Sequence, residues 1–271
     1  MAMAAACKMA GEIDSTGCAM QIATLTRRTV LLGTLAALAA QVCRAQPSWP
    51  ASVQLGCVEN EPMTDTALGI LREAYRRIGI EVVGVPMPPE RAAAAVNAGE
   101  FFGDVTHVAG IDAVYPNLVR VPVALISFEV LAFTYGRDLP LRAWPDLQPY
   151  RICIRRGLKS IEKATASFPQ VSAVSQSANI FNMLKHGRCD VAVLPDTAWL
   201  ELERLNIRGM RTQDTPLQSW PLYHYVHKTH AAVIPALTQA LQEMQKSGFL
   251  AARQADFSKR LRQARRGLSS E

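Results

Sequence analysis

The sequence predicts an α/β protein with two lobes that face each other across a cleft. Short apolar, β-rich runs alternate with amphipathic helical patterns along most of the chain. This alternation occurs in two series, which are separated by a Pro-rich stretch at 138–150. The chain connects the two series near 135–139 and again near 214–217, so two hinge crossings are expected. Ligands of open α/β sheets bind beyond the carboxyl ends of the strands, which places the expected site in the cleft.

The composition is that of a folded globular protein. The chain has 271 residues, of which 49% are hydrophobic, and its mean hydropathy is +0.06. These values exclude a disordered chain, and 16 Gly with 16 Pro exclude one long coiled coil. The formal net charge is +6, but no run of five or six like charges marks a nucleic-acid arm. We therefore expect no nucleic-acid partner.

The first 45 residues have the layout of a secretory signal. Arg27 and Arg28 precede an apolar stretch at 30–40, and a small-x-small cleavage pattern ends at Ala45. The 15 residues between Arg28 and Arg44 are fewer than the roughly 20 needed to span a bilayer. We expect export to the periplasm, by the general secretory route or by the twin-arginine route that the Arg pair resembles.

Translation is expected to start inside this segment. Glu12 and Asp14 lie before Met20, and acidic residues are foreign to the basic start of a signal. The hypothesis is that Met20 is the true start.

Three cysteines follow the signal, namely Cys57, Cys153 and Cys189. An exported protein can keep disulfides, and a Cys153–Cys189 bond with one buried thiol is one interpretation. Three free buried cysteines are the other, and both stay open. No C-x-x-C spacing supports a zinc ribbon, and His224 and His227 fall on opposite faces of a strand, so no metal site is expected.

The first series predicts alternating strands and helices. Leu68, Leu71 and Tyr75 share one face of a helical pattern whose other face is charged. The expected elements are strand 52–58, helix 66–80, strand 81–87, a helix that starts at the prolines 88–89 and stops at Gly99, strand 103–108, and a β-rich run at 118–136 interrupted by Pro122.

The second series has shorter elements, whose strands are apolar enough to be buried in a parallel sheet. They are a short helix at 144–147, strand 151–157, helix 160–168, strand 171–176, helix 177–187, strand 190–196 and helix 197–206. An aromatic strand at 219–227 and a long amphipathic helix at 231–249 follow. These patterns assign 50–136 with 217–260 to lobe 1, 137–216 to lobe 2, and 261–271 to a basic tail expected to be a fraying surface helix.

Four segments, taken in order, resemble a known family. They lie at 88–105, 115–125, 144–157 and 181–196. This order is similar to that of the bacterial family-3 extracellular solute-binding proteins, whose type 2 periplasmic-binding fold includes the amino-acid receptors of ABC importers. The likeness covers nearly all of 50–255.

The resemblance implies a monomeric receptor without a cofactor. Such a protein would capture a small polar solute, amino-acid-like or a carboxylate, and present it to an inner-membrane permease or sensor. Two alternatives stay open: a periplasmic enzyme of the dehydratase type on the same scaffold, and a ligand-sensing module. No catalytic motif is present, so no enzyme activity is expected.

The order of strands and helices predicts six ligand-binding residues in the cleft. They follow strands or begin helices: Glu61, Arg91, His107, Arg156, Gly157 and Asp196. Related amino-acid receptors have an Arg near the position of His107 and an Asp at that of Phe102, so an ordinary α-amino acid is in doubt as the ligand. Each of these residues could instead have a purely structural role. Asp196 suits a helix cap, and only one of Arg155 and Arg156 can point to a given face.

Overall fold

The computed structural model describes residues 49–59 and 61–269, and these residues form one compact unit. The predicted signal and the Met20 start lie outside the described residues. Among the described residues, no helix is long and apolar enough to cross a membrane.

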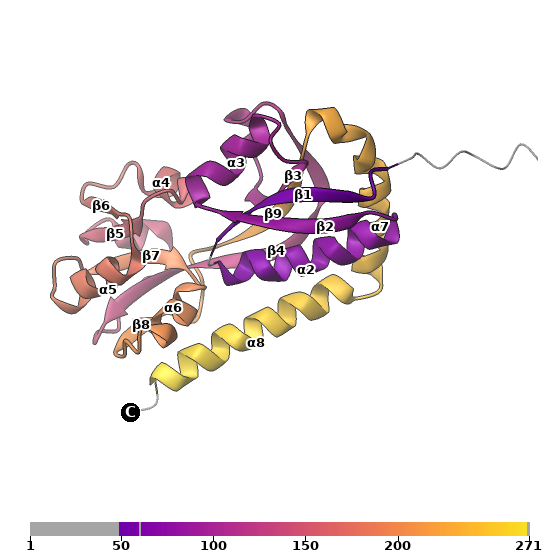
Figure 1. Ribbon diagram of the computed structural model, residues 1–271. Coiled ribbons are helices and arrows are strands. Elements are labelled where there is room, and N and C mark those ends of the chain that lie inside the picture. Colours follow the sequence, from indigo (N-terminus) through magenta and orange to yellow (C-terminus); the bar gives the residue numbers. More distant parts are fainter. Residues whose placement is uncertain (1–48, 60, 270–271) are drawn as a thin grey trace, which may run out of the picture. The chain divides into compact units, whose positions relative to one another are not determined.

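Within the described part of the chain, nine strands form one mixed sheet (Figure 1). The strands are β1 (Ser52–Val58), β2 (Glu81–Met87), β3 (Gly103–Val108), β4 (Leu118–Tyr135), β5 (Ile152–Arg155), β6 (Val171–Val174), β7 (Val191–Pro195), β8 (Met210–Thr212) and β9 (Gln218–His227). Their order is β2-β1-β3-β9-β4-β7-β5-β6, and β8 pairs with β4. Two parallel groups, β2-β1-β3 and β7-β5-β6, thus flank the antiparallel pair β9-β4.

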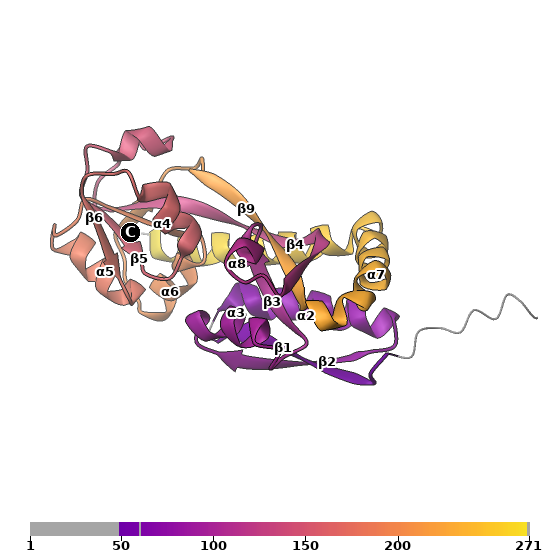
Figure 2. The same ribbon diagram turned by 90° about the horizontal axis from the view of Figure 1, so that it is seen from above.

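Strand β4 joins the two halves of the sheet. Its first part pairs with β9, and its last part pairs with β7 and β8. The sequence predicted an interruption at Pro122, whereas β4 continues through it. The pairing of β4 with β9 shifts register between Arg120 and Ala124. A β-bulge of this kind tolerates proline, which has no N–H to donate to the neighbouring strand. Figure 2 shows β4 and β9 running side by side from one half to the other.

Helices cover both faces of the sheet. They are α2 (Pro62–Arg77), α3 (Pro89–Asn97), α4 (Lys159–Thr165), α5 (Ser177–Lys185), α6 (Ala198–Arg204), α7 (Ile234–Lys246) and α8 (Phe249–Ser269), with short 3₁₀ turns at Ile111–Ala113, Trp144–Leu147 and Lys228–Val233. In Figure 1, α2, α7 and α8 lie on one face of the first half, and α3 lies on the other. Helix α2 starts four residues before the predicted 66, so Glu61 is its N-cap.

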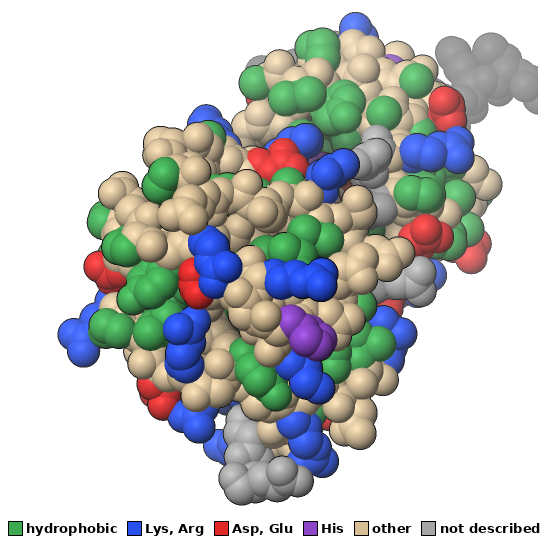
Figure 3. Space-filling view, turned by 90° about the vertical axis from the view of Figure 1, so that its left-hand side faces the viewer, with side chains coloured by type: hydrophobic (Ala, Val, Ile, Leu, Met, Phe, Trp, Pro, Cys, Tyr) green, Lys and Arg blue, Asp and Glu red, His purple; other side chains and the backbone are tan. Residues whose placement is uncertain are grey.

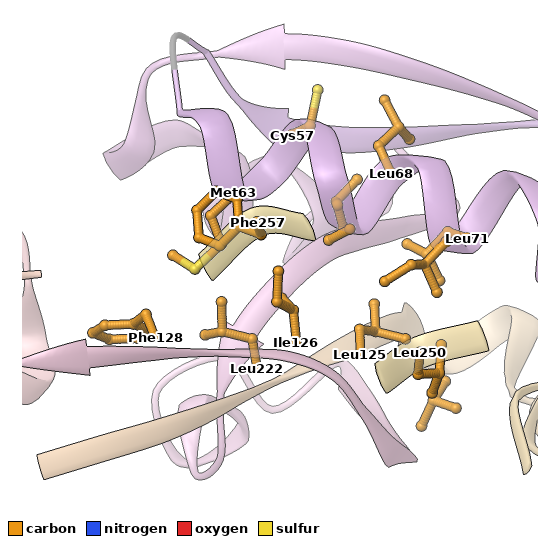
Figure 4. Packing of buried hydrophobic residues seen from close by; sticks show 14 of the residues in the cluster. Cys57, Met63, Leu68, Leu71, Leu125, Ile126, Phe128, Leu222, Leu250 and Phe257 are labelled. Carbon is orange, nitrogen blue, oxygen red and sulfur yellow. The ribbon is translucent and has the colours of Figure 1, made fainter. Parts of the chain in front are cut away.

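The C-terminal segment differs most from expectation. The sequence predicted a fraying tail at 261–271, but α8 is helical to Ser269 and packs on the protein along its length. Leu250, Phe257, Leu261 and Ala264 are buried, and their spacing puts them on one helix face. Figure 4 shows Leu250 and Phe257 packed with residues of α2 and β4. Further along, α8 contacts α6, so one helix packs on both halves of the sheet.

The structure agrees with one of the two interpretations of the cysteines that the sequence left open. Cys57, Cys153 and Cys189 are free, buried thiols, which agrees with the interpretation of three free buried cysteines. Cys153 and Cys189 both lie in the core of the second half, where the Cys153 thiol donates to the thioether sulfur of Met183 at 3.9 Å.

Candidate functional site

The carboxyl ends of parallel strands from the two halves bring three charged residues together. Glu61 follows β1, Arg155 ends β5, and Asp196 follows β7. This is the position at which open α/β sheets bind ligands, because helix N-termini and strand ends leave polar groups there.

Glu61 and Arg155 face each other across the two halves. A guanidinium nitrogen of Arg155 lies 4.0 Å from a carboxylate oxygen of Glu61, with side-chain exposures of 32% and 20%. The other oxygen of Glu61, Oε1, is buried and has no hydrogen-bond partner among the described residues. Burial raises the pKa of Glu61, opposed by the charge of Arg155. The contact is long for an ion pair, so each group keeps capacity for another partner.

Asp196 is the second buried carboxyl. It is 8% exposed, its backbone N–H donates to the carbonyl of Glu129 at 2.8 Å, and its Oδ1 has no partner among the described residues. Burial raises its pKa to about 7, and the charges of Glu129 and Glu61 act in the same direction. Asp196 also lines a polar cavity of about 140 Å³ between β4, α6 and α8. The cap of α6 is Thr197, so Asp196 does not take the predicted alternative role of N-cap.

Arg156 and Gly157 turn away from this group. The Arg156 side chain donates to the carbonyl of Ala173 at 3.1 Å, along the neighbouring strand β6. The Gly157 N–H donates to Glu162 at 2.8 Å, and the φ of +92° favours glycine there. The structure thus brings Arg155, rather than Arg156, to Glu61. Successive side chains of a strand point to opposite faces, so the sequence predicted that only one of Arg155 and Arg156 would face the cleft, but it did not predict which one.

Arg91 and His107 lie apart from the contact between Glu61 and Arg155. Arg91 is exposed on the first turn of α3. His107 is half-buried on β3, opposite Tyr223 of β9, and burial lowers its pKa to about 4. His107 is therefore neutral at physiological pH and offers no positive charge in place of the expected Arg.

The buried histidine of β9 was missed by sequence reasoning. His224 is fully buried; one ring nitrogen hydrogen bonds to the hydroxyl of Tyr75 at 2.8 Å and the other to the carbonyl of Asp104 at 2.7 Å. Asp104 is 1% exposed, and burial raises its pKa to about 8. These residues tie β3, β9 and α2 together inside the first half, away from the strand ends. Among the described residues, no group of three or more His, Cys, Asp or Glu is arranged to hold a metal ion.

The comparisons with known proteins bear on the fold. No family model matches the chain. An uncharacterized protein of Shewanella oneidensis is 22% identical over 250 residues, which cover 84% of this chain and 93% of the relative. An ancestral arginine-binding protein bound to arginine superposes with a TM-score of 0.62 at 14% identity, covering 77% of this chain and 99% of that chain.

The chain has the type 2 periplasmic-binding fold. A second solved structure, a histidine kinase sensor domain with similarity to periplasmic binding proteins, has a TM-score of 0.62 at 13% identity and covers 76% of this chain and 95% of that chain. The predicted two-lobed α/β fold, with a cleft and two hinge crossings, is thereby confirmed. In this fold β4 and β9 run through both halves of the sheet, and Glu61, Arg155 and Asp196 lie at the carboxyl ends of β1, β5 and β7.

Proposed function

We propose that the protein is an exported, non-catalytic receptor that binds a small amino-acid-like solute carrying an ammonium group and presents it to an inner-membrane permease. The observation that carries the proposal is the pair of buried carboxyl oxygens, Glu61 Oε1 and Asp196 Oδ1, which have no partner among the described residues. A buried carboxylate without a partner is costly, and a bound ammonium group would satisfy it. The neighbours with the same fold support a binding role, since one is an arginine-binding protein.

The charge pattern favours a solute of mixed charge. Two carboxyl groups, Glu61 and Asp196, accompany one guanidinium, Arg155, at the facing strand ends. A ligand ammonium would bind the carboxylates, and a ligand carboxylate would take Arg155, which now contacts Glu61 at 4.0 Å. Glu61 would then exchange one partner for another when the solute binds.

Binding should depend on pH because Asp196 must be ionised to hold a cation. With a pKa of about 7, Asp196 is about one-tenth ionised at pH 6 and about nine-tenths ionised at pH 8. An ammonium ligand should therefore bind about tenfold more tightly at pH 8 than at pH 6. Below pH 7, binding of the ammonium ligand should release a proton from Asp196.

A thermal-shift screen of the full chain with amino acids, polyamines and small carboxylates tests the proposal. A solute that binds the folded state raises Tm in proportion to the logarithm of its concentration over Kd. For a solute found in this way, Glu61→Gln and Asp196→Asn should each weaken binding about tenfold or more, since charge-assisted bonds are lost. Glu203→Gln, an exposed acid on α6, is the matched control and should bind like the wild type.

Failure of every solute to raise Tm would overturn the proposal. So would unchanged affinity in both cleft variants. Arg155→Gln tests the carboxylate end of the ligand, because it should weaken binding of solutes that carry a carboxylate more than binding of simple amines.

A sensing role is the second candidate, and the sensor domain with the same fold favours it. A sensor would bind the same solute but act through a protein partner instead of a permease. Copurification with a membrane permease from cells supplied with the solute would support transport, and copurification with a kinase would support sensing. Conversion of the solute to a product would instead favour the dehydratase-type enzyme, with Glu61 or Asp196 as the acid or base.

A further inference from the structure

A second pocket lies at the C-terminal half of α8, and it shares Trp199 and Arg265 with the smaller cavity that Asp196 lines. It has a volume of about 390 Å³, within the range of small-molecule sites. Its walls come from the loop after β4, from β8 and the loop before it, from α6 and from the last turns of α8. The lining residues include three arginines, two hydrogen-bond donors and one acid: Arg208, Arg211, Arg265, Trp199, Thr212 and Asp138.

Two buried polar atoms of the lining have no hydrogen-bond partner among the described residues. They are the indole Nε1 of Trp199 and the hydroxyl of Thr212. Trp199 is 3% exposed, and its indole N–H can only donate. A donor that is buried but unused points to an acceptor that completes it, because buried polar groups are nearly always hydrogen bonded.

The arginines give the pocket a positive field. Arg265 of α8 lies over the Trp199 ring, with its guanidinium carbon 5.7 Å from the ring centroid. Arg211 already binds the carboxylate of Asp138, and Arg265 binds that of Asp214 at 3.0 Å. Both acids are largely exposed, with side-chain exposures of 69% and 96%, so water competes for these pairs. An anion inside the pocket would meet the same arginines with less competition from water.

The protein surface around the pocket also carries many positively charged side chains. Figure 3 views the molecule from the end that carries α5, α6 and β8, and lysine and arginine side chains are spread over this face. A basic surface raises the local concentration of anions and speeds their association.

We propose that this pocket binds a small multivalent anion that carries phosphate or carboxylate groups. The oxygens of the anion accept hydrogen bonds from the guanidinium groups of Arg208 and Arg211, from the indole N–H of Trp199 and from the hydroxyl of Thr212. Because Arg265 belongs to α8, Arg208 precedes β8 and Arg211 lies within it, the anion also links α8 to the second half of the sheet.

Calorimetric titration of the full chain with inorganic phosphate and, separately, with citrate tests the site. Sodium chloride keeps the ionic strength constant, so that screening does not imitate binding. Saturable binding of at least one anion is expected. The anion that binds with the higher affinity shows whether the pocket prefers phosphate or carboxylate groups. Arg208→Gln and Arg211→Gln should each weaken binding about tenfold, and Trp199→Phe, which keeps an aromatic ring but removes the N–H donor, should weaken it several-fold.

Two controls make the result specific. Arg204→Gln removes the same charge from α6 outside the pocket lining and should leave affinity unchanged. Glu61→Gln, which changes a residue that lines neither this pocket nor the cavity beside Asp196, should also leave anion affinity unchanged, which separates this site from the contact between Glu61 and Arg155. Absence of saturable binding for both anions up to about 10 mM, a very weak affinity, would overturn the proposal, as would an equal loss in Arg204→Gln and Arg208→Gln.

Discussion

Asp104 should make the stability of the protein fall between pH 7 and pH 8. The side chain is 1% exposed, and burial raises its pKa from 3.8 to about 8, although the backbone N–H groups of Thr106 and Val105 donate to it. The folded state therefore keeps a proton that the unfolded state releases near pH 4. Stability that is present at low pH is lost as the pH rises through the folded pKa.

The size of the effect follows from this pKa. One carboxyl that titrates at about 8 lowers the free energy of unfolding by about 1 kcal/mol between pH 7 and pH 8. Asp196, with a pKa of about 7, adds about 0.4 kcal/mol over the same interval. His107 and His224 titrate at about 4 in the folded state, so their effect lies between pH 4 and 6.5 and ends below this window.

Urea denaturation of the full chain at pH 7 and pH 8 measures the change directly. The Asp104→Asn variant keeps the shape of the protonated acid and removes its titration. Its loss of stability between the two pH values should shrink by about 1 kcal/mol, which corresponds to about 2–4 °C in Tm.

The matched control is Asp256→Asn, which changes an exposed acid on α8 and should keep the wild-type slope. Parallel pH dependence in the wild type and in Asp104→Asn would refute the reasoning, whatever the absolute stability of the variant.

Three further results are expected. Phe257→Ala should cost about 3–5 kcal/mol in urea denaturation, because the ring is 2% exposed in the core beneath α8; a loss under about 1 kcal/mol would mean that α8 is not docked. Tyr75→Phe should cost about 1–3 kcal/mol, because it leaves a buried nitrogen of His224 unpaired, and an unchanged Tm would contradict the 2.8 Å bond. Cys153 and Cys189, 0% and 2% exposed, should be alkylated far more slowly in the folded protein than in urea, and mass spectrometry showing equal rates would contradict their burial.

The local pattern predicted most of the elements and missed those that depend on tertiary contacts. The alternation of apolar strands with amphipathic helices predicted both parallel groups of strands, because burial of one face imposes its period on the sequence. The continuity of β4 through Pro122 depends on a bulge against β9, a partner about 100 residues further along the chain. The charge of the C-terminal segment suggested a fraying end, but the apolar face at Leu261 and Ala264 meets α6 and β4 only in the folded protein.

The candidate site was also predicted in part from the sequence and in part only from tertiary contacts. Topology placed Glu61 and Asp196 at strand ends, because a residue that directly follows a buried parallel strand emerges at the edge where ligands bind. It did not select Arg155 over Arg156, since the choice depends on which face of β5 meets the other half of the sheet.

The sequence by itself determined the fold class, the order of strands and helices, and the chemical types of the residues near the cleft. Only the tertiary structure decided which side chains meet across the hinge, that the cysteines stay free, and that α8 closes a basic pocket against β8. The physical reason is that periodicity records whether a residue is buried, while the identity of its partner is set by contacts between segments far apart in the chain.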